Sequence, residues 1–339
     1  MMKPVLFGAL AVASLAAGLA SAQTTLEQVQ DRGVVSCGAN DSLPGFAART
    51  ANGDWAGFDV ALCQAVAAAV LGDPGAVAFA TMTPDAGLAA LDEGEIDVLV
   101  RVTWSVTNDA SRNLDFVGIN YFDGTGFMVR ADLGIAAATE LEGATVCVTS
   151  GSATEPHLDD FFRTNNITYV AVPVDDSREG QEQYIAGNCE VLGGAISRLA
   201  ATRATFETSS EHVILPEILS KEPLGAAVRH GDDEWADIVR WTLNALIAAE
   251  EYGVTSVNVM DLAEEPTANR EINRLLGTEG SLGAMLGLPD DWAVHAISAV
   301  GNYGEVFEGN IGESTPVGLA RGLNAQWTNG GLLFSPPFR

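Results

Sequence analysis

Short β-branched segments alternate with helical segments along the first part of the chain. Apolar residues recur at intervals of three and four over residues 58–71, which predicts a helix with a buried face, and a Gly-Asp-Pro-Gly turn ends it. Strands are predicted on either side of this helix, over residues 33–39 and 77–81. A helix over residues 84–91 and a strand over residues 96–100 continue the series. This alternation is typical of a mainly parallel sheet covered by helices.

A second unit of the same kind begins near Gly126, and the later part of the chain returns to the first unit with a long helix over residues 234–251. The pattern therefore predicts an α/β protein with two lobes and a crevice between them. Residues 23–125 and 224–339 are expected to form the first lobe and residues 126–223 the second. The strands expected in the second unit are residues 126–129, 145–149, 169–172, 191–192 and 213–215, and its helices are residues 155–164 and 178–185.

The first 22 residues differ from the rest and predict a secretory signal peptide. Lys3 precedes an apolar run from Val5 to Leu19, and Ala20-Ser21-Ala22 forms an A-x-A cleavage site. A membrane-spanning helix is the alternative, but it needs about 20 apolar residues and usually charged flanks. Gln23, and not a cysteine, follows the cleavage site, so no lipid anchor is expected there. We therefore expect a soluble mature protein in the periplasm.

The chain has four cysteines, Cys37, Cys63, Cys147 and Cys189. In an oxidising compartment an even number of cysteines favours disulfides over free thiols. Four cysteines allow three pairings, and the one that keeps both bridges local joins Cys37 to Cys63 and Cys147 to Cys189. That pairing would place one bridge in each lobe, and Cys63 lies on the buried face of its predicted helix.

Composition narrows the possible partners. The chain carries 17 basic and 45 acidic residues, a formal net charge of −28 spread along its length, which argues against nucleic acid as a partner. Its four histidines lie far apart in the sequence and match no metal-binding pattern, and no nucleophile-elbow or phosphate-loop motif occurs in a fitting context. We expect no cofactor and no metal ion.

The loop of residues 150–155 is the sharpest candidate for a binding site. It follows a predicted strand and ends where a helix begins, so backbone N–H groups and the hydroxyls of Ser152 and Thr154 could bind a carboxylate. The alternative is plain capping of the helix by one of these two side chains.

Two further loops follow predicted strands of the first lobe. Residues 101–109 are polar and aromatic and lie at the carboxyl end of a strand, where ligands of open α/β sheets collect, unless Trp104 is only a packing anchor in a surface loop. Residues 41–46 end in Phe46, which could form an apolar wall against a ligand or fold into the core.

Longer motifs extend over almost the whole mature chain. The most specific is Ala320-Arg321-Gly322-Leu323-Asn324-Ala325 near the end of the chain, because no general property of a two-lobed fold requires it. Together the motifs resemble those of the periplasmic general L-amino-acid-binding proteins that supply ABC-type importers. The other motifs are residues 45–48, 55–60, 114–118, 123–124, 126–130, 215–218, 220–225 and 301–308.

The resemblance implies a type II-like periplasmic-binding-protein fold, with two lobes joined by two crossover strands near residues 124–127 and 220–225. It implies a ligand cleft between the lobes that closes on one amino acid or related small molecule. The expected partners are the membrane subunits of an ABC importer, and the expected state is a monomer. The local cysteine pairing matches the family's two bridges in position.

The chain departs from the family at both charged ends of the expected ligand clamp. Asn108 stands where an arginine usually binds the ligand's carboxylate, and Ala195 stands where an aspartate usually pairs with its ammonium group. Each loss is expected to cost a few kcal/mol, roughly two decades of affinity. We therefore expect weak binding of a standard amino acid, or a ligand whose anion uses Arg101, Ser152 and the helix N-terminus.

The resemblance carries over a set of cleft residues and favours a binding protein that catalyses no reaction. An enzyme on the same scaffold, similar to a dehydratase and using Glu155 or Asp41, is one alternative, and a ligand-dependent sensor subunit is another. The residues expected to bind the ligand are Phe46, Arg101, Thr103, Asn108, Gly151, Ser152, Thr154 and Ala195.

Overall fold

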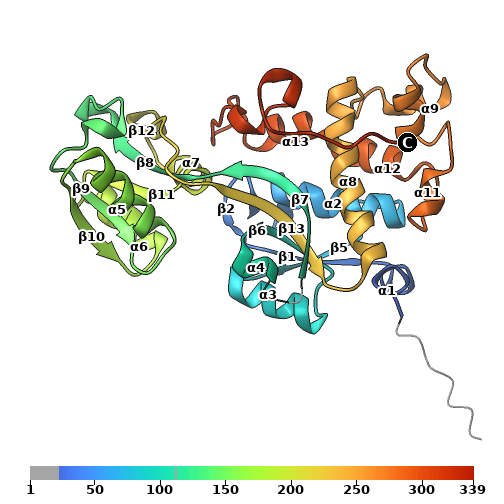
Figure 1. Ribbon diagram of the computed structural model, residues 1–339, viewed down its shortest axis with the longest axis horizontal. Coiled ribbons are helices and arrows are strands. Elements are labelled where there is room, and N and C mark those ends of the chain that lie inside the picture. The colour runs from blue at the N-terminus through green and yellow to red at the C-terminus, as the bar shows by residue number, and fades with distance from the viewer. Residues whose placement is uncertain (1–22, 111, 113) are drawn as a thin grey trace, which may run out of the picture.

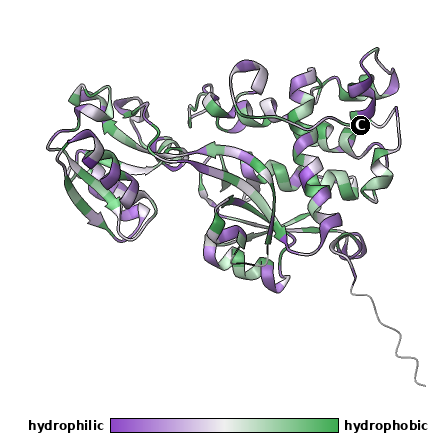
Figure 2. Cartoon of the chain, in the orientation of Figure 1, coloured by the Kyte–Doolittle hydropathy of each residue, from purple (hydrophilic) through white to green (hydrophobic). Residues whose placement is uncertain are grey.

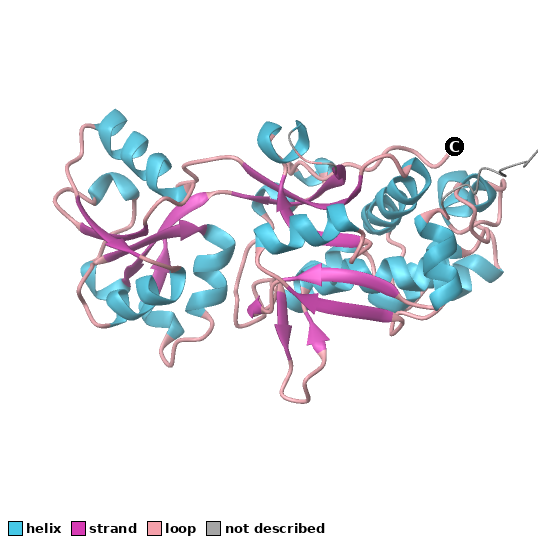
Figure 3. Cartoon of the chain, turned by 90° about the horizontal axis from the view of Figure 1, so that it is seen from below, coloured by secondary structure: helices cyan, strands magenta, loops and turns pink. Residues whose placement is uncertain are grey.

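The computed structural model describes residues 23–110, 112 and 114–339. The predicted signal peptide, residues 1–22, lies outside the described residues. Two bodies, each built around a five-stranded sheet, lie side by side in Figure 1, and two long strands connect them. Figure 3 shows from below that helices flank both sheets and that the connection is narrow. The two-lobed α/β fold that the sequence predicts is thus confirmed.

The sheet of the first lobe has the strand order β5-β1-β6-β13-β7. Strand β1 pairs in parallel with β5 and β6, as the β-α-β pattern predicts. Strand β13 runs antiparallel to both of its neighbours, because the chain enters it on its way back from the second lobe. The five strands are β1 (Val35–Ala39), β5 (Val77–Thr81), β6 (Val98–Thr103), β7 (Leu114–Asp123) and β13 (Glu222–Arg229).

Helices cover both faces of this sheet, and a small antiparallel sheet lies beside it. Helices α2 and α8 pack on one face and α3 on the other. The first-lobe helices are α1 (Thr25–Arg32), α2 (Phe58–Leu71), α3 (Pro84–Glu93), α4 (Val106–Ala110), α8 (Asp233–Tyr252), α9 (Val259–Glu264), α10 (Arg270–Leu275), α11 (Leu282–Met285), α12 (Trp292–Val300) and α13 (Tyr303–Asn310). The small sheet consists of β2 (Ser42–Leu43), β3 (Ala47–Arg49) and β4 (Trp55–Ala56).

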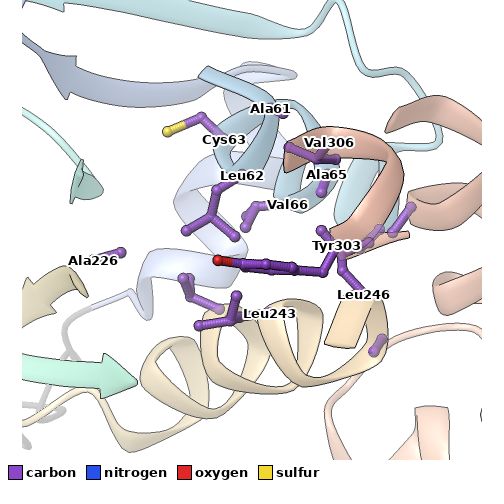
Figure 4. Close-up of a cluster of buried hydrophobic side chains, with 14 of the residues drawn as sticks. Ala61, Leu62, Cys63, Ala65, Val66, Ala226, Leu243, Leu246, Tyr303 and Val306 are labelled. Carbon is purple, nitrogen blue, oxygen red and sulfur yellow. The ribbon is translucent and has the colours of Figure 1, made fainter. Parts of the chain in front are cut away.

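The C-terminal helices complete the core of the first lobe. Tyr303 of α13 is buried, and its ring lies between Leu62 of α2 and Leu243 of α8 (Figure 4). Its hydroxyl donates a hydrogen bond to the Asn120 carbonyl at 2.8 Å, so the polar end of this side chain is satisfied inside the core. The helix α2 is buried on almost every side, which is consistent with its mostly apolar sequence and its mainly hydrophobic colour in Figure 2.

The sheet of the second lobe has the order β10-β9-β11-β8-β12, with α5 on one face and α6 and α7 on the other. Its strands are β8 (Thr125–Arg130), β9 (Thr145–Thr149), β10 (Val170–Val174), β11 (Val191–Ala195) and β12 (His212–Ile214). Its helices are α5 (Thr154–Asn165), α6 (Ser177–Ile185) and α7 (Ile196–Arg203). Short 3-10 helices occur at Ala131–Leu133, Ala138–Glu140, Ser209–Glu211, Gly322–Asn324 and Trp327–Asn329.

The chain crosses between the lobes at Gly124, between β7 and β8, and at the start of β13. Glu222 pairs with Asp123 across the two crossover strands. A side chain at Gly124 would meet the Ser220 carbonyl oxygen at 2.7 Å, so the close approach of the two segments requires glycine. The lobe boundaries at 125/126 and 223/224 stay a prediction, although both sheets begin or end within a few residues of them.

Both predicted disulfides are present. Cys37–Cys63 joins β1 to α2, and Cys147–Cys189 joins β9 to the loop two residues before β11, with Cα–Cα distances of 6.4 and 5.7 Å. Each bridge therefore lies within one lobe, and all four cysteines are buried.

Two features are absent from the described residues, a membrane-spanning helix and a metal-binding cluster. Within the part of the chain that the structure describes, every helix is too short or too polar to cross a membrane. Among the same residues, no three or more His, Cys, Asp or Glu side chains are grouped so that they could hold a metal ion.

Candidate ligand-binding site

A cavity of about 270 Å³ lies between the two lobes. The carboxyl ends of β1 and β6 line it from the first lobe, where the strand order predicts a ligand site. The starts of α5 and α7 line it from the second lobe, and the crossover residues Asp123, Thr125 and Glu222 line it from the connection. A molecule bound here would contact both lobes at once.

Arg101 is the central cation of this cavity. It belongs to strand β6, which runs on to Thr103, so the predicted end of this strand at Val100 was three residues too early. The backbone of Arg101 has φ 62°, a left-handed conformation that costs free energy in a residue with a side chain. The pairing of β6 with β13 is irregular between Gly225 and Ala227, at the same level of the sheet. The strained backbone of Arg101 therefore lies where the hydrogen bonding between β6 and β13 is locally irregular, and it orients the Arg101 side chain.

Two carboxylates, a hydroxyl and an aromatic ring hold the Arg101 guanidinium. Its Nη1 lies 3.4 Å from Asp59 Oδ2, and its Nη2 lies 3.7 Å from Asp123 Oδ2 and donates a hydrogen bond to Ser197 Oγ. The guanidinium carbon lies 4.2 Å from the centre of the Phe46 ring. Burial raises the pKa of Asp59, and the positive charge of Arg101 opposes that increase. The charge of Arg101 is therefore already balanced within the protein.

Phe46 is fully buried in the core of the first lobe. Its ring lies beneath Arg101 and makes edge contacts with Phe58 and Tyr121. The alternative that Phe46 folds into the core thus describes its observed position, and the residue reaches the cavity through Arg101. Direct contact of Phe46 with a ligand stays a prediction.

Thr103 and Asn108 both line the cavity. The Asn108 side-chain amide donates to the Thr103 carbonyl at 2.9 Å, which fixes its orientation. Trp104 stacks on Phe116 at 5.1 Å between ring centres and donates to Asp109, so it is a packing anchor. Neutral groups therefore line this part of the wall, where the family resemblance implies an arginine.

The loop before α5 differs from the predicted anion site. The Gly151 N–H donates to the Glu155 carboxylate at 2.9 Å, and the Ser152 hydroxyl donates to the Thr149 carbonyl at 2.7 Å. Neither Ser152 nor Thr154 caps the helix, because the N-cap is Ala153 and makes no side-chain cap. Thr154 lines the main cavity, whereas Ser152 lines a neighbouring cavity of about 170 Å³. Ligand contacts of Gly151, which lines neither cavity, and of Ser152 and Thr154 stay predictions.

An acidic group and an imidazole lie at the crossover side of the cavity. Glu222 lines the cavity, and its Oε1 lies 4.0 Å from His157 Nδ1. Thr125 lies 3.2 Å from the same nitrogen through its hydroxyl. Burial raises the pKa of Glu222, and His157 opposes that increase. Thr125 and Glu222 line the cavity and can hydrogen-bond a polar ligand there, whereas His157 contacts these two side chains from outside the lining.

Arg198 is a cavity residue that the sequence did not single out. It lies in the first turn of α7, three residues after Ala195, and both residues line the main cavity and its neighbour. The sequence pattern does not predict the helix α7, and without this helix Arg198 has no predicted place at the carboxyl end of β11. One signal in the sequence could have indicated Arg198. It is a cationic residue three positions after Ala195, which is itself a predicted cleft residue.

Comparison with known proteins points to one family. A model described as bacterial extracellular solute-binding proteins, family 3, matches residues 35–256. The chain is 55% identical over 340 residues to the glutamate/glutamine/aspartate/asparagine-binding protein BztA of Rhodobacter capsulatus, and 48% identical over 343 residues to the general L-amino acid-binding periplasmic protein AapJ of Rhizobium johnstonii. Both matches cover 100% of each chain.

A solved structure agrees in fold. The periplasmic binding protein of an ABC transporter from Brucella ovis, with glutathione bound, has a TM-score of 0.87 and 46% sequence identity. This match covers 94% of the present chain and 100% of the other. The chain belongs to family 3 of the bacterial extracellular solute-binding proteins.

Proposed function

We propose that this protein captures a polar amino acid, or a small molecule derived from one, and delivers it to the membrane subunits of an ABC-type importer. The observation that carries the proposal is the cavity between the lobes, which charged and polar side chains from both lobes line. Relatives of full length are named for binding amino acids, and a similar structure holds glutathione. The proposal therefore covers free amino acids and small peptides of comparable polarity.

Capture would work by closure of the lobes on the ligand. Only a ligand that contacts both lobes favours the closed arrangement, because a ligand shifts an equilibrium by its differential affinity for the two states. Arg101 already reaches Ser197 of the other lobe, so this pair is one contact that closure could tighten. The closed form would then be the one that docks on the importer.

We also propose that the chain catalyses no reaction and reaches the periplasm through a cleavable signal at residues 1–22. Asp41 and Glu155, the residues considered for acid or base catalysis, do not line the main cavity. Asp41 accepts a hydrogen bond from Thr81 at 2.8 Å, and Glu155 accepts one from the Gly151 backbone. Two buried disulfides fit an oxidising compartment.

A thermal-shift screen of the purified, oxidised protein tests the proposed function. The compounds are the common amino acids, glutathione and, as controls, sugars of similar size. A ligand present at 100 times its Kd should stabilise the protein by about 2.7 kcal/mol and raise the melting temperature accordingly. Shifts with sugars only, or with none of these compounds, would refute capture of amino acids.

A further inference from the structure

We propose that Arg198 binds a carboxylate of the ligand in the cavity between the lobes. This inference rests on the proposed function, since it names the group that recognises the ligand at the same site. It also names the ligand class: a small molecule with at least one free carboxylate.

The position of Arg198 suits this role. It projects from the first turn of α7 and lines both the main cavity and the smaller one beside it. Thr154 and Ala195 also line both cavities, so the two spaces meet around Arg198. Neither of these neighbours carries a charge. A carboxylate at this junction would lie next to the guanidinium and small uncharged side chains.

The two arginines of the cavity differ in charge balance. Arg101 has Asp59 and Asp123 within ion-pair distance. Among the residues that the structure describes, none forms a hydrogen bond or an ion pair with the side chain of Arg198. Burial lowers the pKa of Arg198, the positive charge of Arg101 lowers it further, and the negative charge of Asp123 opposes this decrease. A partly buried guanidinium that Asp123 compensates only at a distance is unfavourable, and a ligand carboxylate would compensate it directly with charge-assisted, bidentate hydrogen bonds.

Three backbone N–H groups at the helix starts of the site already have partners within the protein. The Gly151 N–H bonds the Glu155 carboxylate, which occupies the place of an external anion at the start of α5. At the start of α7, the Ile196 N–H bonds the Gly124 carbonyl and the Ser197 N–H bonds Asp123. Asp123 also accepts from Gly124 and Ser197 Oγ, so it is shared among several donors. Of the two cationic side chains that line the cavity, Arg198 is therefore the one more readily available to a ligand carboxylate.

Calorimetric titration of the full-length mature protein tests this assignment. The probes are L-glutamate, L-glutamine, the dimethyl ester of L-glutamate, and succinate, which has carboxylates but no amino group. The variants are Arg198→Gln, Arg198→Lys and the control Arg163→Gln, which removes the same charge from an exposed ion pair on α5. Wild-type protein should bind at least one free carboxylate probe and should bind the dimethyl ester far more weakly.

The expected loss in Arg198→Gln is about 30-fold or more in Kd, because a buried charge-assisted contact disappears. Arg198→Lys should fall in between, since a lysine keeps the charge but not the bidentate fork. Arg163→Gln should match wild type. Unchanged affinity in folded Arg198→Gln, or equal binding of L-glutamate and its dimethyl ester by wild type, would overturn the assignment.

The outcomes separate this inference from the proposed function. Binding of L-glutamate or L-glutamine with equal affinity in wild type and Arg198→Gln would keep the proposed function and refute the role of Arg198. Binding of succinate alone, lost in Arg198→Gln, would support Arg198 and refute capture of amino acids. If Arg198→Gln does not fold, two measurements still test the role of Arg198. They are the affinity of Arg198→Lys relative to wild type, and the affinity of wild type for L-glutamate relative to its dimethyl ester.

Discussion

The pairing of Arg101 with Asp59 places a charge deep inside the first lobe, where only 2% of the Asp59 side chain is exposed. We predict that Arg101→Met lowers the free energy of unfolding by about 3 kcal/mol at pH 8, because the carboxylate is left buried and without its partner. Urea denaturation at constant pH measures this change.

The double variant Arg101→Met with Asp59→Asn provides the control. Replacing the carboxylate by a neutral amide should recover part of the lost stability, since no uncompensated charge remains. A double variant that is less stable than Arg101→Met would show that the ion pair is not the source of the effect.

The pKa values of His212 and His230 should lie on opposite sides of the ordinary histidine pKa of 6.5. Burial lowers the pKa of His212, which hydrogen-bonds Tyr184 at 2.8 Å, whereas the hydrogen bond to Asp115 raises the pKa of His230. Because protonation of His212 is disfavoured in the folded state, its contribution to stability is complete above pH 6.5 and is lost as the pH falls. For His230 the contribution is complete below pH 6.5 and is lost as the pH rises through its folded pKa.

Proton NMR of the four histidine side chains checks the order of the two midpoints. The variants His212→Gln and His230→Gln assign the signals by removing one each. A midpoint for His212 at or above that for His230 would contradict the structure.

Several residues that the sequence places in a ligand cleft lie around one cavity, but the sequence does not predict their contacts. Arg101, Thr103, Asn108, Thr154 and Ala195 line the main cavity. The positions of Arg101 and Thr154 follow from a strand end and a helix start, whereas Asn108 and Ala195 rest on the family resemblance. That these residues bind a ligand stays a prediction. The partners of these residues could not be read from the sequence, since they depend on which segments meet in space. Arg101 meets Asp59 from α2 and Ser197 from the other lobe, and neither contact leaves a local signal.

At the scale of single elements, the close approach of β13 and β7 depends on a glycine. A side chain at Gly225 would lie 2.2 Å from the Gly118 carbonyl oxygen. We predict that Gly225→Ala destabilises the protein by about 2 kcal/mol, because the strands must separate. The control is Gly309→Ala on the exposed face of α13, where a Cβ meets nothing within 4 Å and should stabilise the helix by about 0.5 kcal/mol.

Chemical denaturation of both variants tests this pair. Equal stability of Gly225→Ala and Gly309→Ala would mean that the two strands tolerate a wider spacing than the structure has.

Each disulfide should contribute to the stability of the lobe that contains it. They close loops with sequence separations of 26 and 42 residues, and a bridge of this kind stabilises by about 3–4 kcal/mol in the chain-entropy description. We predict that the paired substitution Cys37→Ala with Cys63→Ala destabilises the first lobe by that amount. Limited proteolysis in urea, with fragments identified by mass, shows which lobe opens first.

In reducing buffer the wild type also lacks the first-lobe disulfide, so the cleavage profiles of wild type and variant should become the same. A difference that persists after complete reduction would assign the effect to packing of the sulfur atoms.

Elements with strong local patterns were predicted well. Residues 58–71, 77–81 and 145–149 have the predicted bounds, because a continuous apolar period and clear turn residues define them. The ten-residue strand β7 and the short helices α7 and α9 to α13 were not predicted. These helices gain most of their stability from contacts with distant elements, so their local patterns are weak.

At the scale of the whole molecule, the net charge of −28 should make stability sensitive to salt. Like charges repel in the compact state, and the screening length falls from about 30 Å at 0.01 M salt to about 3 Å at 1 M. We predict that the melting temperature rises as NaCl is increased over this range. A falling melting temperature would mean that ion pairs such as Arg32–Asp97 contribute more than the repulsion.

The helix α7 belongs to both halves of the molecule. Its Leu199 packs in the core of the second lobe, whereas Ala200 and Ala201 pack with the core of the first, and Arg203 donates to the Val317 carbonyl at 2.8 Å. The same helix carries Arg198 into the cavity. A rearrangement of the lobes that breaks these contacts loses their free energy. The strength of the contacts therefore affects how often the binding-competent arrangement is populated. The apparent affinity scales with that frequency, and selection can therefore tune ligand uptake at residues that no ligand ever touches.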